Sequence, residues 1–245
     1  LLAGGYSPWL AFGAAMLAGM LAGVATGLLH TKLKIPALLA GILTMIALYS
    51  VNLRVMGKAN LSLLRVDTVF SIMRDIGGFS NAQAVLCVGI VSSFLIGGLI
   101  YWFFGTEIGA AIRATGFNPQ MIRAQGVDTN FTIILGLLIS NALVALSGAL
   151  VAQNNGFADV GMGTGTIVIG LASVIIGEVL FGTRSFKNCL ISVVLGSVVY
   201  RIVIAAVLAM GMPPNDLKLF TSVLVAIALS LPLIKAKLNS RKVVG

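Results

Sequence analysis

Long, uninterrupted apolar stretches constrain the fold of this chain more than any other feature of its sequence. Five of them hold at least nineteen residues, close to the roughly 20 that cross a bilayer as a helix, and two are shorter, with sixteen. They do not alternate between apolar and polar residues, so they predict helices and not barrel strands. The stretches are residues 8–29, 35–53, 82–104, 131–152, 166–181, 189–211 and 219–234. The sequence therefore predicts an all-α polytopic helical membrane bundle with about seven spans.

Composition supports the membrane assignment. Hydrophobic residues make up 58% of the sequence and charged residues 9%, against roughly 25% charged residues in soluble domains. No soluble linker or low-complexity tail separates the spans, so we expect residues 1–245 to form a single transmembrane domain. The chain opens in an apolar run without an initiating Met. We therefore expect one or more N-terminal helices to be missing from this sequence.

A short polar segment, residues 106–128, separates the third and fourth apolar stretches and begins with signals for a small helix. Thr106 can cap a first turn that contains Glu107. Gly116 is expected to end this helix in a left-handed conformation. An ordinary structured loop is the alternative interpretation.

The second half of the 106–128 segment carries a second set of signals. Asn118 followed by Pro119 is typical of a helix start, and Gly126 of a stop. Polar side chains expected to face water are Arg113, Arg123 and Gln125. Apolar side chains expected to face the protein or the membrane are Ile108, Ala111, Ile112, Met121 and Ile122. Two capped helices at a membrane surface suit docking onto a protein in the aqueous phase.

The basic residues choose an orientation for the bundle. One side of the membrane would carry ten of them, namely Lys32, Lys34, Arg113, Arg123, Arg184, Lys187, Lys235, Lys237, Arg241 and Lys242. The other side would carry five, namely Arg54, Lys58, Arg65, Arg74 and Lys218. Cytoplasmic loops are enriched in Lys and Arg, so the 106–128 segment is predicted to be cytoplasmic. The net charge of +9 is thus a topology signal and does not indicate nucleic acid binding.

Three motifs resemble one family. The first runs Arg113-Ala114-Thr115-Gly116, Asn118, then Arg123 to Asp128 as RAQGVD. The second is GLASVIIGE at residues 170–178, followed by Leu180-Phe181-Gly182, and the third is Tyr200-Arg201 with Pro213, Asp216, Leu217 and Lys218. Together they resemble bacterial ABC importer permeases of the branched-chain amino acid and ribose branch, especially those labelled as tryptophan/tyrosine or uncharacterised permeases.

The resemblance implies a function and partners. The chain would be the membrane-spanning permease of an importer in the bacterial cytoplasmic (inner) membrane. It would work with cytoplasmic ATPase subunits that hold ATP and Mg, an extracytoplasmic substrate-binding protein and a second permease copy, identical or not. The solute would be small and amino acid-like, although ribose-like sugars stay open. Residues of the 106–128 segment that would couple to the ATPase are Glu107, Arg113, Gly116, Asn118, Arg123 and Gly126.

Enzyme chemistry on this chain is not expected. No GxxxxGK[ST] phosphate loop, acid/base pair, nucleophile triad or metal cluster occurs in the sequence, so ATP would be hydrolysed by a separate subunit. Cys87 and Cys189 lie in or beside apolar stretches. We expect them to pack as small hydrophobic residues and not to form a disulfide. The alternative function is a stand-alone secondary transporter or channel.

Two ionisable residues lie within predicted spans. Arg201 is near the middle of the sixth stretch, where its charge is costly, so we expect it to face the bundle interior and to have a partner. Glu178 is the candidate, but upright helices would leave the two about 13 Å apart in depth. Arg201 is expected either to be structural or to bind the carboxylate of an amino acid. Other polar residues that could line a solute path, or bind neighbouring helices, are Thr44, Tyr49, Ser140, Asn141 and Ser147.

Three further regions carry expectations. The first stretch has small residues at four-residue spacing, Ala15, Gly19, Gly23 and Gly27, which predict a helix-packing face. Residues 54–81 form the longest predicted extracytoplasmic connection, expected to contain a surface helix and either to be a solvated loop or to dock a binding protein. Residues 153–165 are rich in Gly and are expected to form an irregular, re-entrant segment at an outer gate.

Overall fold

The computed structural model confirms the all-α membrane fold and describes residues 1–63, 66–78, 80–163 and 166–211, together with 216, 219, 220, 222, 223, 226 and 230. The contacts divide the chain into two compact units, 1–162 and 163–245. Each unit is described by itself below. The prediction of a single domain over residues 1–245 stays a prediction.

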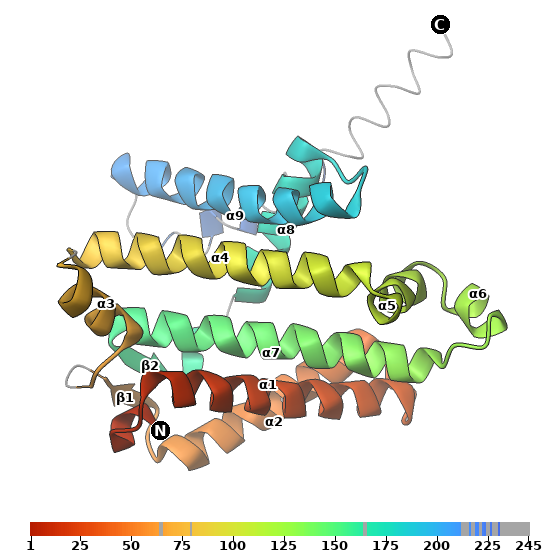
Figure 1. The fold of residues 1–245 in the computed structure, drawn as a ribbon, viewed down its shortest axis with the longest axis horizontal. Helices are drawn as coiled ribbons and strands as arrows, with labels where there is room; N and C mark the ends of the chain where they lie inside the picture. Colours follow the sequence, from red (N-terminus) through yellow and green to blue (C-terminus); the bar gives the residue numbers. More distant parts are fainter. Residues whose placement is uncertain are drawn as a thin grey trace, which may run out of the picture. The chain divides into compact units, whose positions relative to one another are not determined.

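Unit 1 contains most of the helices (Figure 1). Its elements are η1 (Leu2–Gly4), α1 (Pro8–Thr31), α2 (Ala37–Met56), β1 (Asn60–Ser62), α3 (Val69–Gly77), α4 (Asn81–Gly105), α5 (Glu107–Phe117), α6 (Pro119–Ala124), α7 (Thr129–Asn155) and β2 (Phe157–Asp159). The 3-10 helix η2 (Val160–Gly163) lies at the boundary between the units. Unit 2 contains α8 (Thr166–Phe181) and α9 (Phe186–Ala209).

Within the described residues, six helical segments are long and apolar enough to cross a membrane. They are Pro8–Thr31, Ala37–Met56, Asn81–Gly105, Thr129–Asn155, Val160–Phe181 and Phe186–Ala209. These match the first six predicted spans to within a few residues at each end. The short fifth stretch reaches membrane length only together with η2. Most of the seventh predicted span, 219–234, lies outside the described residues.

The glycine ridge of α1 packs against α7, as a packing face predicts. Gly19, Gly23 and Gly27 are all buried. A Cβ atom added at Gly19 would lie 2.5 Å from the carbonyl oxygen of Asn141, and one at Gly23 would lie 2.5 Å from that of Leu137. Only glycine allows backbones to approach this closely, so the ridge fixes α1 against α7 through dispersion contacts.

Helix α2 joins α1 through a buried pair of threonines. The Thr26 hydroxyl donates to Thr44 Oγ1 at 2.8 Å, and the Thr44 hydroxyl donates to the carbonyl of Ala40 on its own helix at 2.9 Å. At the turn between the two helices, His30 Nδ1 donates to the carbonyl of Ile35 at 2.8 Å. These hydrogen bonds satisfy polar groups for which lipid offers no hydrogen-bond partner.

Unit 2 contains a second close contact between small residues. Gly177 of α8 faces Ser192 and Gly196 of α9, and a Cβ atom at either glycine would overlap the backbone of the other helix. Ser192 Oγ donates to the carbonyl of Gly182 at 2.8 Å. Tyr200 is buried against Ala172 next to this seam. Small residues four apart on both helices therefore hold α8 and α9 together.

One end of unit 1 carries an ordered structure that we name the cap: β1, β2, α3 and the last turn of α7 (Figure 1). β1 and β2 pair antiparallel, with Ser62 opposite Phe157. Helix α3 confirms the helix expected within residues 54–81. Residues 153–165 are more regular than expected, because α7 continues to Asn155 and residues 157–159 form a strand paired with β1, while residues 164 and 165 lie outside the described residues and the gate role stays a prediction. Pairing with a distant strand satisfies backbone groups that the local sequence left unpaired.

Candidate functional site

The 106–128 segment forms two helices, α5 and α6, at the end of unit 1 opposite the cap (Figure 1). Thr106 caps α5 as predicted, because its Oγ1 accepts from the backbone N–H of Gly109 at 3.3 Å. Gly109 lies so close to α4 that an added Cβ atom would overlap the backbone of Phe103 and Phe104. This glycine allows α5 to turn sharply against the end of α4.

The predicted end of the first helix at Gly116 was wrong. Gly116 is helical and α5 continues to Phe117, while the glycines with positive φ in the described chain do not include Gly116. The helix ends because Asn118, with φ −152° and ψ 92°, precedes Pro119, and proline disfavours helical geometry in the residue before it.

The other two signals of the segment are confirmed. Asn118 caps α6, since its Oδ1 accepts from the N–H of Met121 at 3.1 Å, and Pro119 occupies the first turn. Gly126 has φ +86°, and its N–H donates to the carbonyl of Arg123. This left-handed residue ends α6, and Asp128 then caps α7 by accepting from Asn130 N–H at 2.8 Å.

Two side-chain contacts fasten the segment to the start of α7. Thr115 Oγ1 and Thr132 Oγ1 lie 2.9 Å apart in a buried hydrogen bond. The guanidinium of Arg123 donates to Thr129 Oγ1, from Nη2 at 2.7 Å and from Nε at 3.3 Å. Arg123 was predicted only to face water; it is exposed but also joins α6 to α7. Arg113 was also predicted to face water, but its side chain is half-buried.

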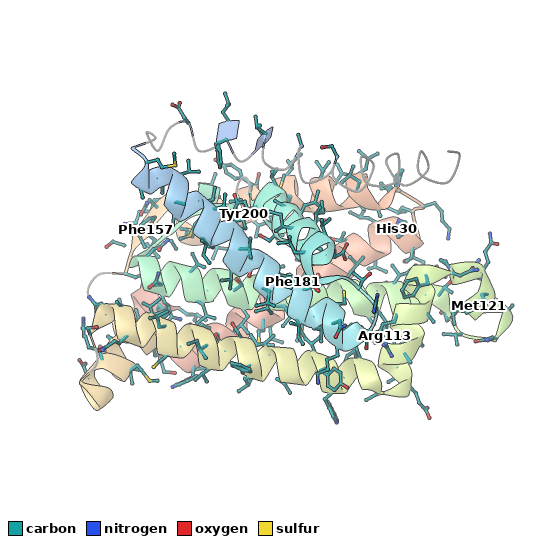
Figure 2. The ribbon with its side chains drawn as sticks, turned by 90° about the horizontal axis from the view of Figure 1, so that it is seen from above. His30, Arg113, Met121, Phe157, Phe181 and Tyr200 are labelled. Atoms are coloured by element: carbon teal, nitrogen blue, oxygen red, sulfur yellow. The ribbon has the colours of Figure 1, made fainter. Side chains whose placement is uncertain are left out.

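The exposed surface of the segment is partly apolar. Phe117 is 92% exposed at the corner between α5 and α6, and Met121 of α6 and Ile108 of α5 are also exposed. Ile122 is buried, and Ile112 packs near Gly136 of α7, as predicted. Figure 2 shows Met121 and Phe157 at opposite ends of unit 1. Sequence reasoning missed Phe117, although its place just before an Asn-Pro helix start marked it as a corner residue.

The predicted solute-path residues divide into two groups. Thr44 is occupied in the contact of α1 with α2. Asn141 lies at the contact of α1 with α7, and its Nδ2 donates to the carbonyl of Leu137 at 2.9 Å. Thr44 therefore serves helix packing, whereas the Asn141 side chain bonds its own helix, and a solute-path role for both residues stays a prediction. Exposed members of the set are Tyr49, Ser140 and Ser147, the last two on one stripe of α7.

The candidate partners in unit 2 do not meet, in line with the offset in depth expected for them. Glu178 and Arg201 are both exposed and make no ion pair; the one ion pair found among the described residues joins Arg74 and Asp75. Arg201 is exposed within unit 2, so the expectation that it faces the bundle interior stays a prediction. Its neighbour Tyr200 occupies the buried stripe of α9, and consecutive residues of a helix point about 100° apart.

Comparison with known proteins identifies the family. Residues 1–230 match the model described as branched-chain amino acid transport system / permease component. The chain is 42% identical to a tyrosine transport system permease protein of Clostridioides difficile over 224 residues, covering 91% of this chain and 73% of that protein. It is 34% identical to an uncharacterized protein of Rickettsia prowazekii over 220 residues, covering 88% and 76%.

A more distant similarity, at 28% identity over 179 residues, is to the autoinducer 2 import system permease protein LsrC of Escherichia coli; it covers 73% of this chain and 51% of that protein. No solved structure matches the chain. The match over 230 residues, the six membrane-length helices and the doubly capped 106–128 segment agree with one another. The chain therefore belongs to the branched-chain amino acid transport system permease components, a permease family of ABC transporters.

Proposed function

We propose that this permease imports an amino acid-like solute into the cytoplasm, driven by separate ATPase subunits that hold ATP and Mg. The 106–128 segment would be cytoplasmic and would dock the ATPase. A substrate-binding protein would deliver solute at the opposite side, and a second permease copy would complete the pathway in the bacterial inner membrane. The positive-inside distribution of Lys and Arg supports this orientation.

The exposed aromatic corner of the 106–128 segment carries the proposal. Phe117 is 92% exposed, yet Thr115, two residues earlier, is buried in a hydrogen bond to α7. A large apolar side chain on a rigid, doubly capped support is the type of residue that fills a pocket on a partner protein. Phe117 would be the main anchor, and Met121 would extend the contact.

The solute we infer is an aromatic or similar amino acid. The 42% identity to a protein named as a tyrosine transport system permease supports this choice. Exposed Ser140 and Ser147 on α7, and exposed Tyr49 on α2, are polar residues of the predicted path that lie outside the packing contacts described above. Arg201 and Glu178 stay candidates for the path, since both are exposed on unit 2 and a charge within a span needs a polar partner.

The test replaces the anchor and measures ATPase docking. Phe117→Ser should reduce co-purification of the ATPase subunits and abolish uptake, because the apolar contact is lost. Phe131→Ser is the matched control, since Phe131 is also exposed but lies on α7 outside the segment. Both variants should insert and purify like the parent.

Two outcomes would overturn the assignment. Normal ATPase binding and uptake by Phe117→Ser would remove the anchor role. Failure of any ATPase to co-purify with the unmodified permease, together with uptake driven by an ion gradient, would favour the alternative of a secondary transporter. Uptake of ribose without competition by tyrosine would instead correct the solute class.

A further inference from the structure

Side-chain hydrogen bonds fasten helix α7 at both of its ends. They join its first residues to α5 and α6, and its last turn to α3. At one end, Thr132 bonds Thr115 of α5, and Thr129 bonds Arg123 of α6. These two contacts lie within the first four residues of α7, which starts at Thr129. Any displacement of the 106–128 segment must therefore move this end of α7 or break these hydrogen bonds, of which the Thr115–Thr132 bond is buried and costly to lose.

At its other end, within the cap, α7 holds α3 through Gln153. Gln153 is 3% exposed, and its Oε1 accepts from the backbone N–H of Val69 at 3.0 Å. Val69 is the first residue of α3, where helical N–H groups lack partners within the helix. Two backbone bonds continue the connection, from Leu63 N–H to the carbonyl of Gly156 and from Val160 N–H to that of Ala59.

Between these ends α7 is a single uninterrupted helix. It spans 27 residues, or about 40 Å. Along this length it packs against the glycine ridge of α1. Helices bend sharply at prolines, bulges or inserted groups, and the sequence of α7 contains no proline. A displacement applied at Thr132 thus reaches Gln153 with little loss.

We propose that α7 is the transmission element of this permease, and that Gln153 is the positioning residue that makes α3 and the β1–β2 pair move with it as one rigid cap. This inference rests on the proposed function, since it takes the 106–128 segment as the site where ATPase movement enters. It assigns the cap as the part of the outer surface that moves in response. The outer surface would then respond to nucleotide through α7.

The first experiment separates docking from transmission, with the full permease and its ATPase reconstituted in vesicles. Gln153→Leu removes the acceptor for Val69 N–H, while Gln153→Glu keeps an oxygen that can accept from the start of α3. Gln153→Leu should keep ATPase co-purification and basal ATP hydrolysis, yet lose solute-stimulated hydrolysis and uptake by about fivefold or more. Gln153→Glu should restore much of both.

Asn154→Leu is the matched control, because Asn154 is the adjacent amide on α7 but is exposed and lines the groove beside Phe70. It should behave like the parent. Equal stimulation in Gln153→Leu and the parent would overturn the proposal. Loss of ATPase co-purification in the parent itself would mean that the proposed function has failed, and not the transmission role of α7.

The second experiment tests whether the cap moves as one body. Ser62→Cys and Phe157→Cys place thiols on facing, exposed positions of β1 and β2, in a background with Cys87 and Cys189 replaced by alanine. Facing residues of antiparallel strands are close enough for a disulfide. The oxidised protein should transport like its reduced form, since a rigid cap never separates these strands. Uptake that is lost on oxidation and restored by reduction would show that the strands part during transport and would overturn the proposal.

Discussion

Two glycine-bearing helices of unit 1 make different use of the same residue type. On α1, Gly19, Gly23 and Gly27 face the backbone of α7 at distances that exclude any side chain. On α4, Gly89 and Gly97 also share one face, yet a Cβ atom at either would meet no atom within 4 Å. α4 contacts α3 and α5 at its two ends and is mostly exposed along its length.

The difference teaches that glycine spacing shows which face a helix could pack with, and not whether a partner is present. The α1 ridge gains dispersion contacts inside this chain. The α4 face has open space around its glycines in unit 1. This face is therefore available to lipid or to a helix from outside unit 1. The four predictions below test this contrast, from the largest effect to the smallest.

Gly23→Leu should give the largest loss. Its side chain would push α1 away from Leu137 and Leu138 of α7, and forced overpacking costs about 3 kcal/mol or more when backbone must move. Yield and thermal stability in detergent should fall strongly. Gly13→Leu is the control on the same helix, because a Cβ atom there meets nothing within 4 Å. A stable Gly23→Leu protein with only a transport defect would point to a pathway role for the ridge.

Gly196→Leu should destabilise unit 2 by a similar mechanism, with a loss of about 2–3 kcal/mol. The new side chain would overlap Ser173 and Gly177 of α8. Protease accessibility of the turn between α8 and α9 measures the separation of the two helices. Gly170→Leu, on α8 but with open space around its Cβ position, should leave cleavage unchanged. Equal cleavage of both variants would contradict the α8–α9 seam.

Gly97→Ala on α4 should change stability in the opposite direction. A Cβ atom there has open space, and replacing glycine by alanine in a helix gains about 0.5–1 kcal/mol. The thermal midpoint of the purified permease in detergent should rise slightly. A fall would show that another helix covers this face, and would remove the contrast between α1 and α4.

Thr44→Val should have the smallest effect, about 0.6 kcal/mol, the average for a hydrogen bond between membrane helices. The lost bond joins Thr44 to Thr26. Thr26→Val should cost the same, and the double variant should cost little more than either single one, as expected for partners in one bond. Uptake should stay near the parent level; a large loss of uptake without loss of stability would return Thr44 to the solute path.

Local chain signals predicted the 106–128 segment well where they concerned backbone chemistry. Asn118, Pro119 and Gly126 act as expected because capping, a fixed φ and a left-handed turn depend on neighbouring residues alone. The prediction that Gly116 ends α5 was wrong, and the reason is also local: Pro119 disfavours helical geometry at Asn118 and so determines where α5 ends. The contacts of Thr115 and Arg123 with α7 could not be predicted, because they join residues brought together only when the helices pack.

The sequence by itself determined the membrane-spanning helices, their approximate ends and the packing face of α1, because lipid forces every backbone group of a span to bond within its own helix. The tertiary structure alone decided that α7 is the partner of that face, that β1 pairs with β2 across almost 100 residues of chain, and that Gln153 holds α3. Helix formation depends on residues a few positions apart. The choice of partner depends on which surfaces meet in space, and small or polar residues fit many partners until one contact excludes the rest.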